Sequence, residues 1–125
     1  MKAYTDLEQS RKLAEILPHE SADMWWREVS YGFYDIEAEI PKGWYDVPPK
    51  GFPCWSLAAL LNYFREIDFF PEIDADEVMV TMNINYYDEE EARLLAPIHN
   101  IKVKAESFID ACVEMILKMH EQKLL

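Results

Sequence analysis

The sequence predicts an α+β protein: a single domain over residues 1–125, with a small antiparallel or mixed sheet of three to four strands covered by three main helices and one short helix. Apolar residues at helical spacing recur near both ends and in the middle of the chain, and strand-like alternation lies between them. The expected strands are not consistently joined by long helical crossovers, which disfavours a doubly wound sheet. A chain of 125 residues with 50% hydrophobic content can bury one core.

The first expected helix covers residues 6–17. Thr5 and Glu8 have capping-box spacing, with Thr5 as the N-cap and the Glu8 side chain reaching back to it. Apolar residues occupy one side of this segment and charged residues the other, and Pro18 ends it. The pattern is typical of an amphipathic surface helix.

Strand patterning follows over residues 25–40, but its parity changes on the way. The apolar residues are first on odd and then on even positions: Trp25, Val29, Tyr31 and Phe33, then Ile36, Ala38 and Ile40. Either a bulge near Tyr34 and Asp35 makes one bent strand, or a tight turn near Gly32 makes a hairpin. We favour the bulge because no strong turn dipeptide is present.

The segment 41–53 is the strongest candidate for a binding surface. It holds four of the seven prolines and two of the three glycines, interleaved with Trp44, Tyr45 and Phe52. The prolines disfavour regular structure and reduce the entropy lost when a loop is held in place. A stiff loop that displays aromatic rings can anchor a protein partner. Alternatively, the rings fold back as a lid over the next helix.

That next helix, over residues 53–64, is the expected centre of the core. The stretch carries no charge, and its leucines and Phe64 fall at positions i, i+3, i+4 and i+7. Pro53 suits the first turn of a helix, where its missing N–H is no loss. We therefore expect a nearly encircled helix that begins at Pro53.

Residues 66–91 contain ten acidic residues and no Lys or Arg. A calcium loop that starts at Asp74 fails, because Met79 occupies the glycine position and Asn85 the position of the bidentate Glu. We expect no metal and no cofactor. The run predicts a solvated acidic face or, alternatively, a surface that meets a basic protein partner.

The C-terminal half adds two strands and two helices. Clean alternation predicts a strand over residues 78–86, a short helix capped by Asp88 should end at Pro97, and residues 99–105 alternate again with His99 on the core side. Ser107 and Asp110 form a capping box for the last helix. Its apolar stripe comprises Phe108, Cys112, Met115 and Met119, widened by Ala111 and Ile116.

The charge balance excludes several classes of partner. A formal net charge of −12 and a pI of about 4.5 disfavour direct binding to nucleic acids or anionic membranes. No apolar run resembles a signal peptide or a membrane span, and both cysteines lie in apolar patterns. We expect a cytoplasmic protein with two buried thiols.

Cys54 and His99 are the remote catalytic candidates. A thiol at a helix start has a lowered pKa, and a histidine 45 residues later in a strand could serve as its base. Against catalysis, no Asn or Gln lies just upstream of Cys54 to complete an oxyanion hole, and only three glycines are present. We expect Cys54 to be a buried thiol rather than a nucleophile.

Several segments resemble a family of short uncharacterised proteins of gut anaerobic bacteria, commonly found on phage-derived segments. The resemblance rests on residues 6–10, 13–18, 21–24, 53–61, 109–112 and 114–118. It implies a cytoplasmic accessory protein of a mobile element, and it supplies no catalytic residues. The leading functional prediction is a non-enzymatic protein-binding module that uses residues 41–53 or the acidic face. The alternative is an acidic decoy or immunity-type inhibitor of a basic nuclease or toxin, and a Cys–His hydrolase is a remote third.

Overall fold

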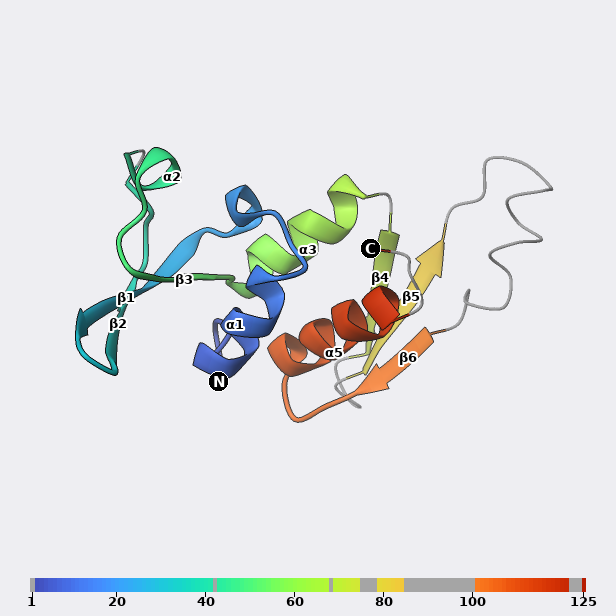
Figure 1. Ribbon diagram of the computed structural model, residues 1–125. Coiled ribbons are helices and arrows are strands. Elements are labelled where there is room, and N and C mark those ends of the chain that lie inside the picture. Colours follow the sequence, from blue (N-terminus) through green and yellow to red (C-terminus); the bar gives the residue numbers. More distant parts are fainter. Residues whose placement is uncertain (1, 42, 68, 75–78, 85–100, 122–124) are drawn as a thin grey trace. The chain divides into compact units, whose positions relative to one another are not determined.

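The computed structural model describes residues 2–41, 43–67, 69–74, 79–84, 101–121 and 125 (Figure 1). The chain divides into two compact units, Met1–Leu60 and Leu61–Leu125, called unit 1 and unit 2 below. The boundary falls inside helix α3 (Leu57–Glu66), in which Leu60 and Phe64 are fully buried. The expectation of a single domain stays a prediction.

Unit 1 is built around a three-stranded antiparallel sheet in the order β2-β1-β3. Helix α1 packs against β3. The elements before α3 are α1 (Leu7–Ala14), the 3₁₀ helix η1 (His19–Ser21), β1 (Met24–Ser30), β2 (Phe33–Glu37), α2 (Gly43–Asp46) and β3 (Gly51–Cys54).

The segment 25–40 forms a hairpin, so the favoured single bulged strand is wrong. Ser30 pairs with Phe33 across a two-residue turn, and Gly32 has a φ of 79°, which glycine adopts without steric cost. The register shifts between Glu28 and Ser30, and the Gly32 N–H donates to Glu28 Oε1 at 3.3 Å. Gly32 and the carboxylate of Glu28 thus stabilise the turn in the absence of a strong turn dipeptide.

The two faces of this sheet carry different side chains, because successive residues of a strand point to opposite sides. On the α1 side, the rings of Tyr34 and Phe52 lie 5.7 Å apart, and the Arg11 guanidinium lies 4.8 Å from the centre of the Phe52 ring. The other face carries Trp25 and an ion pair of 3.2 Å between Arg27 and Glu37.

Helix α3 begins at Leu57, four residues later than expected. Pro53 and Cys54 belong to β3 and pair with Trp25 and Met24 of β1. A proline is tolerated there because β3 is an edge strand. Ser56 starts the helix: its Oγ accepts from the Ala59 N–H at 3.1 Å, which is N-cap geometry.

Two further local expectations are corrected in unit 1. The cap of α1 is Asp6, whose side chain accepts from the Gln9 N–H while the Gln9 side chain accepts from the Asp6 N–H. Thr5, the expected cap, is fully buried instead. The prolines of residues 41–53 also do not exclude regular structure, since α2 and most of β3 lie within this segment.

Unit 2 combines a second three-stranded antiparallel sheet, in the order β4-β5-β6, with helix α5, which packs against β5 and β6 (Figure 1). The elements are β4 (Phe69–Asp74), β5 (Met79–Ile84), β6 (Ile101–Lys104) and α5 (Phe108–Glu121). The expected strands near 78–86 and 99–105 are confirmed in their central parts. β4 was missed because its acidic residues and Pro71 are typical of a solvated loop. β4 is an edge strand, and an edge strand can contain a proline.

Helix α5 follows the predicted cap and stripe. Ser107 Oγ accepts from the Asp110 N–H at 3.1 Å. Buried positions include most of the predicted stripe together with Ile109 and Val113. The expected helix over residues 89–96 and the position of His99 lie outside the described residues. The α+β class is confirmed, with the strands divided between two sheets rather than gathered in one.

Candidate functional site

The three aromatic residues expected to bind a partner lie in different surroundings. Trp44 lies in α2 and is half-buried in the wall of a pocket. Phe52 is half-buried in β3, between Tyr34 and Arg11, on the α1 side of the sheet. Tyr45 lies in α2, and its side chain is outside the described part of the chain. Trp44 and Trp25 therefore line one pocket, whereas Phe52 packs against the Arg11 side chain of α1.

The pocket beside Trp44 has a volume of about 350 Å³. Trp25 forms another part of the wall and is only 6% exposed. The described lining residues are His19, Glu20, Trp25, Ile40, Trp44 and Pro48.

Four large apolar side chains are exposed among the residues whose burial is described, and all belong to unit 1. Val29, Tyr31 and Phe33, which we call the hairpin tip, are 49%, 94% and 69% exposed. Val47, inside residues 41–53, is 80% exposed. Sequence reasoning missed the hairpin tip because strict alternation assigned its residues to the same face as the buried Trp25.

The exposure of the hairpin tip follows from the unequal lengths of the strands. β3 pairs with β1 only from Met24 to Arg27, whereas the β1–β2 pairing continues to Ser30 and Phe33. The hairpin therefore extends beyond β3 as a two-stranded ribbon, visible in Figure 1. A two-stranded ribbon has too few neighbours to bury its side chains. The exposed end of the ribbon also includes the turn and the irregular register at Val29.

Cys54 lies at the end of β3, not at the start of a helix. Its side chain is fully buried, and burial raises the pKa of the Cys54 thiol to about 11. The Sγ atom donates to the Thr5 carbonyl oxygen at 3.3 Å. A protonated thiol that donates to a backbone carbonyl has no nucleophilic character, because the thiolate is the reactive form.

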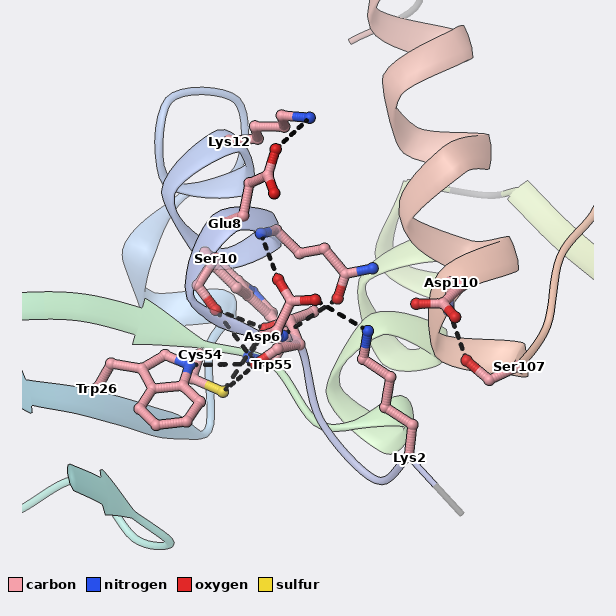
Figure 2. Close-up of polar contacts among 12 residues, drawn as sticks. Lys2, Asp6, Glu8, Ser10, Lys12, Trp26, Cys54, Trp55, Ser107 and Asp110 are labelled. Atoms are coloured by element: carbon pink, nitrogen blue, oxygen red, sulfur yellow. Dashed lines mark hydrogen bonds and ion pairs between the residues drawn. The ribbon is translucent and has the colours of Figure 1, made fainter. Parts of the chain in front are cut away.

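Thr5 is the centre of the network around this thiol, and Figure 2 labels its partners Ser10, Trp26, Cys54 and Trp55. Its hydroxyl accepts from the Trp55 N–H at 3.1 Å and lies 2.8 Å from Ser10 Oγ. Its carbonyl also accepts from Trp26 Nε1 at 3.1 Å. These hydrogen bonds connect the N-terminal segment to the junction between β3 and α3. The polar groups around Cys54 therefore have a structural role.

A second set of bonds positions the start of α3. The Ser56 N–H donates to Asp23 Oδ1 at 3.0 Å, and the Ser56 hydroxyl donates to Asp23 Oδ2. Trp55 Nε1 donates to Ser21 Oγ at 2.9 Å. The described serines and acids near Cys54 thus act as caps and tethers, and none is arranged as a base for the thiol.

The remaining candidates offer little chemistry within the described residues. Cys112 is fully buried in α5, and burial raises its pKa to about 12. His99 and most side chains of the acidic segment 66–91 lie outside the described residues. Among the described residues, no group of three or more His, Cys, Asp or Glu could hold a metal ion.

No family model, curated protein or solved structure matches this chain. The resemblance to phage-associated proteins therefore stays a prediction. Within the described part of the chain, no helix is long and apolar enough to cross a membrane.

Proposed function

We propose that this chain is a non-enzymatic protein-binding module whose interface on unit 1 is centred on the hairpin tip. The observation that carries the proposal is the exposure of Tyr31 and Phe33, at 94% and 69%, on a ribbon that β3 does not cover. Aromatic side chains bury a large area at little entropic cost, which makes them frequent anchors of interfaces. The resemblance noted above favours a cytoplasmic accessory protein of a mobile element as the setting.

Residues 41–53 contribute one exposed apolar side chain to the proposed interface. Val47 is 80% exposed and adds a second apolar contact point, whereas Trp44 and Phe52 are partly engaged in packing. The hairpin tip therefore takes the anchoring role that the sequence suggested for Trp44, Tyr45 and Phe52.

The first prediction compares pull-downs from a lysate of the native host. The double variant Tyr31→Ser/Phe33→Ser should lose the proteins that the wild type retains, because it removes the exposed rings without touching the buried core. Ala58→Ser, at an exposed apolar position of α3 outside the proposed interface, is the control and should retain those proteins. Retention of the same proteins by the double variant, with unfolding temperature unchanged, would exclude the hairpin tip.

A second candidate, an acidic decoy or inhibitor of a basic nuclease or toxin, is favoured by the distribution of charge. Unit 2 contains fourteen acidic and six basic residues, against ten and six in unit 1, and ten of those acids fall within residues 66–91. Charge at this density acts mainly by steering a basic partner toward the surface.

The second prediction concerns salt. Association of a basic partner with the acidic segment should slow as salt rises, because the Debye length shortens to about 8 Å at 0.15 M. Stopped-flow association rates of an isolated partner at low and high salt measure this. An on-rate that does not change with salt would remove the acidic segment from the interface and leave the hairpin tip.

A further inference from the structure

The pocket beside α2 combines two indole rings with a carboxylate. Its volume of about 350 Å³ lies at the lower end of the range for ligand sites, which suits one small head group. Trp25 and Trp44 face it from β1 and α2, and Glu20 borders it from η1. The pocket shares no residue with the hairpin tip, so ligand binding in it does not depend on the proposed protein interface.

Trp25 presents ring carbons to this pocket rather than its N–H group. The Nε1 atom is buried and has no hydrogen-bond partner among the residues that the structure describes. It lies 2.9 Å from the position that a Cβ on Gly51 would take, which places the N–H edge of the ring against β3. Because the N–H is turned to the strand, the contribution of Trp25 to the pocket is π-electron density and apolar area.

Among the described lining residues, the ionisable side chains are those of His19 and Glu20. His19 Nε2 lies 3.2 Å from the Ala14 carbonyl oxygen, and since a carbonyl can only accept, Nε2 donates. In the neutral ring this leaves a lone pair on Nδ1. Glu20 adds an exposed carboxylate, and none of the described lining residues is Lys or Arg.

We propose that this pocket binds an organic cation that carries its charge on an alkylated ammonium group. Such a group is large, weakly hydrated and attracted to the faces of tryptophan rings, which are the best aromatic partners for a cation. Ile40 and Pro48 contact its alkyl part, while Glu20 supplies the opposite charge. The net charge of −12 attracts cations to the molecule as a whole.

The third prediction uses choline as the probe. The chain has four tryptophans, so a ¹⁵N-labelled sample gives four indole N–H signals in an NMR correlation spectrum. Choline should shift the signals of Trp25 and Trp44. Trp26 and Trp55, whose Nε1 atoms are bonded to the Thr5 carbonyl and Ser21 Oγ, are internal references that should not move. The neutral isostere 3,3-dimethylbutan-1-ol should bind far more weakly.

Two variants separate the charge from the rings. Glu20→Gln should weaken choline binding about two- to fivefold, as expected for the loss of one exposed charge. Glu15→Gln, an exposed carboxylate outside the pocket, is its matched control and should leave the affinity unchanged. Trp44→Leu should weaken binding by about fivefold or more while keeping an apolar wall.

A blocked peptide containing trimethyl-lysine tests the source of the cation. Tighter binding of the peptide than of choline would assign the pocket to a modified side chain of a protein, and the reverse order would assign it to a free small cation. Equal affinity for choline and its neutral isostere would overturn the proposal. So would the absence of any shift of Trp25 and Trp44 with both cations.

Discussion

Cys54 shows how the surroundings of one residue decide its chemistry. Burial at the end of β3 raises the pKa of the thiol and outweighs the hydrogen bonds with Thr5, which lower it. The folded chain therefore holds this proton more tightly than the unfolded chain. The resulting contribution to stability is complete below about pH 9 and is lost as the pH rises toward 11. The folded protein should accordingly become less stable above pH 9.

The fourth prediction is slow alkylation of Cys54. At pH 8, iodoacetamide should label this thiol about 100-fold or more slowly in the native protein than in denaturant, because the raised pKa and burial both suppress the reactive thiolate. Peptide mass spectrometry distinguishes Cys54 from Cys112. Rapid native labelling that His99→Ala abolishes would contradict this account and favour the hydrolase.

At the scale of elements, the sheet of unit 1 depends on a close approach between Gly51 of β3 and the backbone of Trp26 in β1. A Cβ on Gly51 would lie 1.8 Å from the Trp26 carbonyl oxygen, and the φ of Gly51 is 149°, a conformation that other residues rarely adopt. Gly51 therefore allows β3 to pair with β1. That pairing also places Phe52 beneath Arg11 and Cys54 beside Thr5.

The fifth prediction follows from this contact. Gly51→Ala should reduce the free energy of unfolding by about 3 kcal/mol or more, because neither backbone can move aside without breaking the pairing. Gly43→Ala is the matched control: a Cβ there has nothing within 4 Å, and the change in stability should stay within about 1 kcal/mol. Urea denaturation measures both. Equal stability of the two variants would contradict the close approach of β1 and β3.

Local sequence patterns predicted α5 and β5 correctly but misplaced the start of α3. The caps and stripe of α5 and the alternation of β5 depend on neighbouring residues only, so the sequence was sufficient. The start of α3 was misplaced because pairing with β1 holds Pro53 and Cys54 in a strand, a tertiary contact that helical spacing cannot report. Ser56, three residues before Ala59, was the overlooked signal for the true start.

At the scale of the whole molecule, exposed aromatic residues lie outside the segment in which the sequence suggested them. The sequence suggested a surface of exposed aromatic residues and placed it at residues 41–53. Among the residues whose burial is described, the most exposed rings belong to Tyr31 and Phe33, because the β1–β2 ribbon continues beyond the edge of β3. Alternation gives the face on which a side chain lies but not whether a neighbouring strand covers that face, so the exposure of the hairpin tip was not predictable.

Site-specific photocrosslinking in the native host shows whether the hairpin tip contacts a protein partner. A benzophenone amino acid at position 31 should capture a defined partner protein, because Tyr31 is 94% exposed at the centre of the proposed interface. The same amino acid at position 15, an exposed site on unit 1 outside the hairpin tip, should not capture it. We expect a specific crosslink at position 31 only. Identical crosslinking patterns at both positions, or none at either, would contradict it.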